Sequence, residues 1–214
     1  MTEAKSRRAK GEQTRRLILE AALRLIVEHG HKAVTHRAVA AEADVNLSLT
    51  TYYFKDLKSL ISEAFDLYRE RIERETQETW SEVFTYIAEH PAESGPSAAA
   101  LRERLANWAA DYIMEQVTQR PSGLVLEMTL FYDMHLDPSL RLAAGALRSR
   151  FKTDFISLCQ RLGSDSPEVD AELFLGTLQR LEYEGLAAGA KPERASIYAQ
   201  MHRLLQWIMG SSPA

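Results

Sequence analysis

The sequence predicts an all-α protein, and three observations carry this prediction. Apolar residues recur at helical spacing along most of the 214 residues, and no stretch alternates apolar and polar side chains as a half-buried strand would. Ten glycines and seven prolines are few for this length, roughly two thirds of average usage. The internal prolines separate helical segments and avoid their interiors, where proline would remove a hydrogen bond; they are Pro91, Pro96, Pro121, Pro138, Pro167 and Pro192.

The first sixty residues predict three helices. An apolar stripe over residues 17–26 indicates a helix that ends at Gly30, because glycine readily adopts the left-handed backbone that closes a helix. Thr35 caps a short second helix, and Asn46 caps a third that ends near Tyr52. Two short helices joined by a tight turn and braced by a longer one form a helix-turn-helix arrangement.

Two pairs of residues assign the faces of the third helix. Thr50 and Phe54 are four residues apart and face the first helix, whereas Ser48 and Tyr52 point to nearly the opposite side. An outward hydroxyl and phenol beside small aliphatic groups suit the major groove of DNA, where they meet base edges and thymine methyl groups. The alternative for Tyr52, and more strongly for Tyr53, is ordinary aromatic packing against the next helix.

Charge divides the chain into a basic head and an acidic body. Residues 1–60 contain eleven Lys or Arg and seven Asp or Glu, whereas the remainder contains 15 basic and 23 acidic residues. A local positive field attracts a polyanion even when the net charge of the chain is −4. An ordinary solvated surface explains the imbalance equally well on charge alone.

Six further helical segments are predicted after the head. Apolar periodicity and the proline positions place them at residues 57–89, 97–119, 122–135, 139–162, 168–188 and 193–209. Together with the head they predict a three-helix DNA-binding tip followed by a larger helical bundle.

Two stretches resemble the DNA-binding head of the TetR (tetracycline-repressor) family of transcriptional regulators. They are T-H-R-A-V-A-A-E-A-D-V-N-L-S-L-T-T-Y-Y-F-K-D-L-K-S-L at residues 35–60 and R-R-L-I-L-E-A-A-L-R-L-I-V-E-H-G at residues 15–30. The resemblance covers roughly residues 12–65. It implies a head of three helices, a larger ligand-binding body, and a dimer built mainly from the last two helices.

The resemblance also implies which residues contact DNA. Those at the start of the second helix approach phosphates and sometimes a base, those on the third helix form the recognition surface, and the last ones hold the DNA backbone. In chain order they are Thr35, His36, Arg37, Asn46, Leu47, Ser48, Leu49, Thr51, Tyr52, Tyr53, Lys55 and Lys58. The chain departs from the family pattern at Asp44, where glycine is usual, at Thr51, where tyrosine is frequent, and at Leu57, where a phosphate-binding lysine is common.

The predicted domains are a flexible basic arm at residues 1–13, a helix-turn-helix DNA-binding domain at residues 14–57, and a ligand-binding and dimerisation domain at residues 58–214. Arms of this kind add affinity by following phosphates or entering the minor groove. A solvated, disordered tail is the alternative.

The last two helices carry broad apolar faces that predict a two-fold, four-helix dimer interface. The candidate interface residues are Leu173, Thr177, Leu178, Leu181, Gly185, Ile197, Met201, Leu204, Leu205 and Ile208. Ordinary core packing within one chain explains the same stripes equally well without the resemblance.

Aromatic and sulfur-containing side chains of the middle helices are candidates for a ligand pocket, because such cavities are mostly apolar. They are Trp80, Phe84, Trp108, Tyr112, Met128, Phe131, Tyr132, Phe151 and Phe155. For any one of them, a place in the core is the stronger interpretation.

Catalytic and metal-binding interpretations find little support. Asp133, His135 and Asp137 alternate before Pro138, where helix capping and solvated turn positions are the simpler account. Cys159 is the single cysteine, and no glycine-rich phosphate loop or nucleophile motif occurs. We therefore expect no enzyme, metal or cofactor.

The sequence predicts a homodimeric, cytoplasmic repressor that a small-molecule effector releases from a near-palindromic double-stranded DNA operator. Apolar runs are too short to span a bilayer, so no membrane association is expected. The alternatives are a helical small-molecule-binding protein or enzyme without DNA function, and a transcriptional activator. The motifs do not identify the effector.

Overall fold

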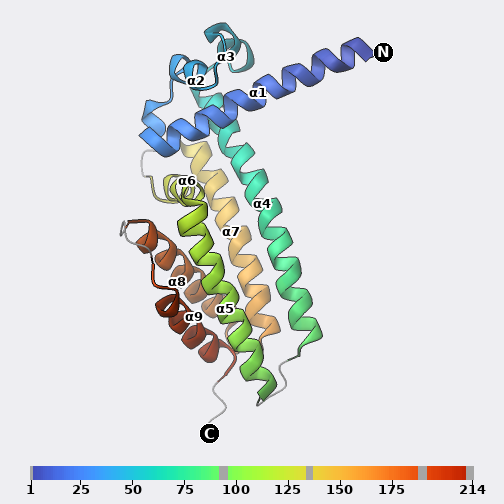
Figure 1. Ribbon diagram of the computed structural model, residues 1–214, viewed down its shortest axis with the longest axis vertical. Coiled ribbons are helices and arrows are strands. Elements are labelled where there is room, and N and C mark those ends of the chain that lie inside the picture. Colours follow the sequence, from blue (N-terminus) through green and yellow to red (C-terminus); the bar gives the residue numbers. More distant parts are fainter. Residues whose placement is uncertain (1, 92–95, 134–136, 188–191, 211–214) are drawn as a thin grey trace. The chain divides into compact units, whose positions relative to one another are not determined.

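The computed structural model describes residues 2–91, 96–133, 137–187 and 192–210, and within these ranges it contains helices and no strand (Figure 1). The all-α prediction is therefore confirmed for the described part of the chain. The elements also follow one another in the predicted order.

Three helices and a short 3-10 turn form the N-terminal head: α1 (Thr2–His29), η1 (His31–Ala33), α2 (His36–Glu42) and α3 (Leu47–Tyr53). Gly30, at φ 78°, ends α1 as predicted. The Thr35 hydroxyl accepts a hydrogen bond of 3.0 Å from the Ala38 amide, which satisfies an otherwise unpaired donor at the start of α2.

Six longer helices follow: α4 (Leu57–Glu89), α5 (Pro96–Gln119), α6 (Pro121–Tyr132), α7 (Pro138–Arg161), α8 (Pro167–Ala187) and α9 (Arg194–Ile208). Four of them begin at a proline, whose missing N–H would have no partner in the first turn. The predicted boundaries agree closely except at α6, which ends at Tyr132 rather than at His135; His135 itself lies outside the described residues.

The predicted basic arm is helical from Thr2 onward, since α1 continues without a break to that residue. Strong helix formers dominate the segment 2–13, and its weakest helix former is Gly11. Gly11 lies close to α3: a side chain there would begin 3.4 Å from the Tyr53 hydroxyl. The basic arm is therefore a helical extension of the head.

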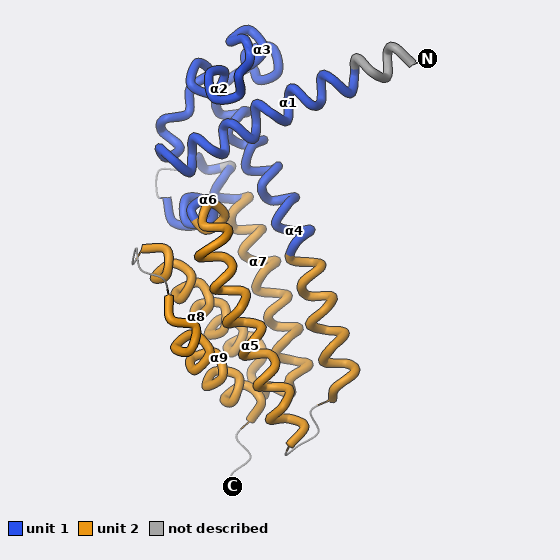
Figure 2. Tube along the Cα trace, viewed as in Figure 1, with its two compact units in different colours: residues 1–75, 125–142 blue, residues 76–124, 143–214 orange. Residues whose placement is uncertain are grey.

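The chain divides into two compact units (Figure 2). Unit 1 comprises residues 1–75 and 125–142, and unit 2 comprises residues 76–124 and 143–214. The head thus shares a unit with the first half of α4 and most of α6, which the predicted boundary at residue 57 did not anticipate. The apolar residues at the start of α4 explain this, since Leu60, Phe65 and Tyr68 are all buried.

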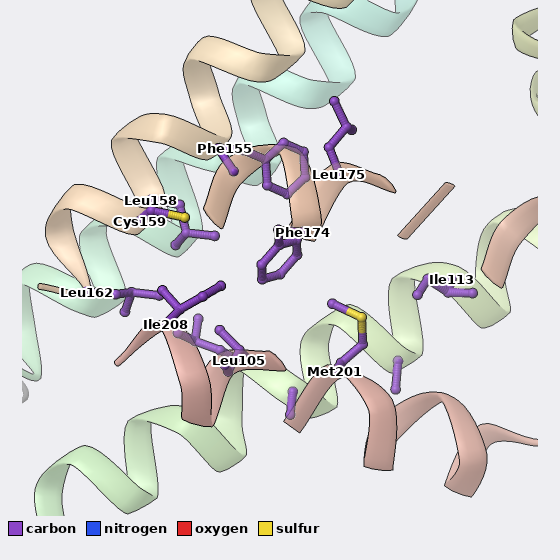
Figure 3. Close-up of a cluster of buried hydrophobic side chains, with 14 of the residues drawn as sticks. Leu105, Ile113, Phe155, Leu158, Cys159, Leu162, Phe174, Leu175, Met201 and Ile208 are labelled. Carbon is purple, nitrogen blue, oxygen red and sulfur yellow. The ribbon is translucent and has the colours of Figure 1, made fainter. Parts of the chain in front are cut away.

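The core of unit 2 is built from the second half of α4 together with α5, α7, α8 and α9, and Figure 3 shows side chains of the last four. Met201 and Leu205 of α9 and Ile113 of α5 are fully buried in this cluster. Phe155 of α7 packs on Phe174 of α8, with ring centroids 5.1 Å apart. Gly185 lets α8 approach α5 closely, because a side chain there would meet Val117 at 3.0 Å.

Candidate nucleic-acid interface

Helix α3 is fixed to the head by its inward face. Thr50 is completely buried, and its hydroxyl donates a hydrogen bond of 2.8 Å to the Leu47 carbonyl. Phe54, just after the helix, is 1% exposed. The predicted inward face is therefore confirmed, and the opposite side of α3 is left to solvent.

The outward face of α3 combines apolar and hydroxyl groups. Tyr52 is 78% exposed and Leu47 is 41% exposed, which are unusual values for large side chains. The Tyr52 ring meets the half-buried Tyr53 ring edge to face, at 5.1 Å between centroids. Ser48 and Thr51, which lie between Leu47 and Tyr52 in the sequence, are also exposed. The Thr51 hydroxyl donates a hydrogen bond of 3.1 Å to the Ser48 carbonyl.

Residues at the N-termini of α2 and α3 border this face. Arg37 is exposed on α2, whereas His36 is half-buried and its carbonyl lies 3.5 Å from the Thr50 hydroxyl. Asn46 precedes α3 and is exposed, yet its side chain makes no capping hydrogen bond. Arg37 and Asn46 thus keep their polar groups available for a ligand.

Several basic residues of unit 1 are already neutralised by acids. Arg15 pairs with Glu63, Arg24 pairs with Glu42, and the Lys58 ammonium lies 3.1 Å from an Asp137 carboxylate oxygen. Among the described residues, Arg37 and Lys55 form no ion pair. The positive charge of the head that remains unpaired therefore includes these two side chains.

The predicted DNA-contacting residues lie in one part of unit 1. Those that the structure exposes are Thr35, Arg37, Asn46, Leu47, Ser48, Thr51, Tyr52, Lys55 and Lys58. The half-buried ones are His36, Leu49 and Tyr53. Tyr53 lies beside Gly11 of α1, so packing accounts for at least part of its environment.

Two acids for which the sequence suggested capping or solvated turn positions each pair with a distant basic residue of unit 1. His31 Nδ1 of η1 lies 2.7 Å from Asp133 Oδ2, and both side chains are largely buried. Asp137 pairs with Lys58 at the start of α4. For Asp133 the solvated-turn interpretation is wrong, because its partner lies far away in the sequence. Asp137 does precede a helix as expected, and its carbonyl accepts a hydrogen bond of 3.0 Å from the Arg141 N–H in the first turn of α7.

Glu127 of α6 is a half-buried acid that the sequence did not single out. Burial raises the pKa of its carboxyl to about 7, while a hydrogen bond with Tyr68 lowers the pKa. Tyr68, on the first half of α4, is 1% exposed. A carboxyl group that is half protonated near neutral pH therefore lies within unit 1.

The candidate pocket residues divide between the two units. Met128, Phe131 and Tyr132 belong to α6 of unit 1, and the other six belong to unit 2. In unit 2, Trp80 stacks on Phe84 at 5.3 Å and meets Phe155 edge to face at 4.9 Å. Trp108 instead contacts Tyr86, and the Arg104 guanidinium lies 4.5 Å from its ring centroid. Of the remaining two, Tyr112 is exposed and Phe151 is half-buried.

The candidate dimer residues also divide into two sets. Five of them lie inside the core of unit 2, namely Leu181, Ile197, Met201, Leu205 and Ile208. Thr177, Leu178, Gly185 and Leu204 are half-buried, and Leu173 is 47% exposed. The core of the single chain thus uses half of the predicted stripe, because the inward faces of α8 and α9 cover α5.

An apolar surface nevertheless remains on α8 and α9. Val169 is 60% exposed, Trp207 is 70% exposed, and the exposed Gly176 lies one turn after Leu173. An Arg180 hydrogen bond of 2.5 Å to Gln200 joins the two helices. Exposed apolar groups on adjacent helices are typical of a protein–protein contact.

Two negative findings concern the described ranges of the chain. They contain no cluster of three or more His, Cys, Asp or Glu arranged to hold a metal ion. None of the helices described combines the length and the apolar character that crossing a membrane requires.

Two family models match the chain. The model for bacterial regulatory proteins of the tetR family matches residues 18–64, and the model for the tetracyclin repressor-like C-terminal domain matches residues 100–207. The first contains α2 and α3, and the second contains most of unit 2. No match was found among curated proteins.

Solved structures share the fold over nearly the whole length. A TetR-family member from Streptomyces coelicolor A3 is 27% identical, with a TM-score of 0.61, over 89% of this chain and 97% of that one. The multidrug-binding protein EbrR, complexed with malachite green, is 26% identical, with a TM-score of 0.58, over 89% and 96%. A transcriptional regulator from Rhodococcus sp. Rha1 is 13% identical, with a TM-score of 0.64, over 91% and 95%.

Proposed function

The chain belongs to the TetR family of bacterial regulatory proteins and is a DNA-binding transcriptional regulator; from this premise we propose that it is a homodimeric repressor that leaves a near-palindromic operator when a small molecule binds. The outward face of α3 is the observation that carries the DNA-binding part. Solvation alone does not explain an exposed phenol, leucine and two hydroxyl side chains on one short, rigidly held helix.

The geometry of the head supports entry of α3 into a major groove. The buried Thr50 and Phe54 hold the helix by one side, so that the other side meets base edges. Arg37 and Lys55 then lie where they bind phosphates, which position the protein without reading sequence. In a two-fold dimer the two α3 helices reach successive turns of the duplex, about 34–36 Å apart.

The apolar surface of α8 and α9 supports the dimer. Val169, Leu173 and Trp207 bury their exposed area if a second copy packs the same two helices against them. Gly176 allows the partner helix to approach closely. A Cβ atom placed at this position would meet no other atom of the chain within 4 Å, so the space above the glycine is open. Leu173 is the residue that this surface shares with the interface predicted from the sequence.

Similarity to EbrR supports a small-molecule effector. Solved structures of EbrR hold malachite green and ethidium, both of which are aromatic cations. The aromatic cluster of Trp80, Phe84 and Phe155 in unit 2 offers rings of the kind that stack on such molecules. An effector dissociates the complex only if it binds the DNA-free state more tightly than the bound state.

A mobility-shift assay with DNA from the regions flanking the gene tests this proposal. We expect a retarded complex that survives excess unrelated DNA, and at least tenfold weaker binding for Arg37→Ala or Tyr52→Ala. Arg74→Ala is the matched control, because Arg74 is an exposed arginine of the same unit outside the head. Absence of any selective complex at low salt would overturn DNA binding.

Malachite green is the probe for the effector step. It should dissociate the complex at concentrations that quench tryptophan fluorescence of the free protein, and a duplex without protein controls for direct binding to DNA. Ethidium is suited only to the DNA-free binding measurement, since it intercalates. Run-off transcription from the bound promoter distinguishes a repressor from an activator.

A further inference from the structure

Helix α3 lacks the side chains that read G·C base pairs most strongly. In the major groove, guanine is best bound by the paired donors of Arg or Lys, and cytosine by a carboxylate. The sequence of α3, L-S-L-T-T-Y-Y, contains none of these residues. Any selectivity that this helix confers must therefore come from hydroxyl, apolar and aromatic groups.

The groups that α3 does expose match thymine. The thymine C5-methyl group is the apolar feature of the major-groove edge, and aliphatic side chains read it by contact. Leu47 and Tyr52 are exposed, and packing on Tyr53 holds the Tyr52 ring in place. Thr51 uses its hydroxyl proton on the Ser48 carbonyl, so it offers a base its methyl group and the acceptor lone pairs of its oxygen, but no donor.

An amide at the start of α3 matches adenine. Asparagine pairs with the N6 donor and N7 acceptor of adenine through both ends of its amide. Asn46 is exposed, and its side chain makes no capping bond that would occupy those atoms. It also lies at the N-terminal end of the helix, which helix-turn-helix proteins direct at the bases.

We propose that α3 selects A·T base pairs: Leu47, Thr51 and Tyr52 contact thymine methyl groups, and the Asn46 amide pairs with an adenine. The Ser48 hydroxyl serves either kind of base pair and does not oppose this. Arg37 lies on α2 rather than on α3. If Arg37 binds a guanine, that base pair is therefore not one of those that α3 contacts. The inference rests on the proposed DNA-binding function and specifies the bases recognised.

Selection from a pool of random duplexes, with the full-length protein, gives the preferred half-site. We expect adjacent A·T pairs at its centre. Each thymine of that centre is then replaced by deoxyuridine, which removes only the methyl group. Binding should weaken about fourfold for each contacted methyl, the value that burial of one such group contributes.

Variants assign the contacts to residues. Leu47→Ala should abolish the effect of deoxyuridine at one position and leave it at the others. Asn46→Ala should reduce discrimination against G·C at one adenine by about tenfold or more. Because the Asn46 side chain makes no capping bond, the substitution removes no hydrogen bond from the fold.

Leu17→Ala is the matched control for Leu47→Ala. Leu17 is 43% exposed, close to the 41% of Leu47, and belongs to α1 of the same unit. It should leave sensitivity to deoxyuridine unchanged, and the two leucine variants should lower the unfolding temperature by similar small amounts, since they lose similar packed area. Loss of the deoxyuridine effect in the control would contradict the assignment.

The outcomes separate this inference from the function on which it rests. Selection of duplexes with G·C pairs under α3, or equal binding of thymine and deoxyuridine duplexes, overturns A·T selection and leaves DNA binding intact. Failure to select any sequence overturns both. A·T half-sites whose methyl dependence disappears in Leu47→Ala support both.

Discussion

Asp44 shows how one residue sustains the turn between α2 and α3. It adopts φ 52° and is the one non-glycine with positive φ among the described residues. Its N–H donates to the Ala41 carbonyl at 3.3 Å, and the Val45 N–H donates to the Ala40 carbonyl at 3.0 Å. These bonds close α2 through a left-handed residue, and Asp tolerates that backbone better than most side chains.

Substitutions at Asp44 should follow their tolerance of left-handed backbone. We expect Asp44→Val to lower the free energy of unfolding by about 1–2 kcal/mol, and Asp44→Gly to stay within about 1 kcal/mol of wild type. Urea denaturation followed by circular dichroism measures both. Equal stability of the valine variant would show that the turn does not impose this conformation.

Glu127 makes stability depend on pH in a defined direction. Its pKa is raised from 4.5 to about 7 by burial, so between these values the folded chain holds a proton that the unfolded chain releases. Folding stability therefore falls as pH rises through this window. Below pH 4.5 the Glu127 carboxyl is protonated in both the folded and the unfolded chain, so stability does not depend on its titration. Above pH 7 it is ionised in both, and the folded chain carries the full free-energy cost of desolvating the carboxylate.

Glu127→Gln should remove this dependence. The variant should gain stability over wild type as pH rises from about 5 to 8, by up to about 3 kcal/mol at the upper end, because glutamine stays neutral and keeps a hydrogen bond to Tyr68. Thermal unfolding across the pH series measures the difference. Glu70→Gln, an exposed position of the same unit, is the control and should show no such trend.

At the scale of elements, local sequence accounts for most helix boundaries. Prolines begin α5, α6, α7 and α8, and Gly30 and Gly163 end helices with positive φ. Asp56 marks the beginning of α4, because its carboxylate accepts a hydrogen bond of 2.7 Å from the Ser59 amide in the first turn. That bond lowers the pKa of Asp56. Such boundaries are predictable because each depends on residues close together in the chain.

Contacts between elements were less predictable, and the pair of Lys58 with Asp137 illustrates why. Lys58 begins α4 and Asp137 precedes α7, and their charged atoms lie 3.1 Å apart. The resemblance places Lys58 at a DNA phosphate. The carboxylate and a phosphate would therefore compete for the same ammonium group.

Asp137→Asn should strengthen operator binding by about two- to fivefold at low salt, since a partly exposed ion pair contributes no more than about 1 kcal/mol. Fluorescence anisotropy with an operator duplex measures the change. The double variant Asp137→Asn with Lys58→Ala should show none of the gain relative to Lys58→Ala alone. A gain that persists without Lys58 would point to general charge repulsion instead.

At the scale of the whole molecule, the proposed dimer depends on apolar groups that the single chain leaves exposed. Val169, Leu173 and Trp207 lie on α8 and α9, whose inward faces already supply the core of unit 2. A helix stripe predicted from sequence does not reveal which part of it a neighbouring helix of the same chain covers.

Leu173→Glu should convert the protein to a monomer and reduce operator affinity at least tenfold, because a buried carboxylate at the interface is unpaired and each half-site alone binds weakly. Sedimentation equilibrium at micromolar concentration measures the mass. Leu142→Glu, at a residue 78% exposed in unit 1, is the control. A dimeric Leu173→Glu variant would place the interface elsewhere.

The helical class, the order of the helices and the head that contains α3 are predictable from the amino-acid sequence, because they depend on periodicity, capping residues and a compact motif. Three-dimensional packing sets which residues of α8 and α9 enter the core, pairs Asp133 and Asp137 with His31 and Lys58, and desolvates Glu127. These features arise from residues far apart in the chain, whose proximity no local pattern specifies.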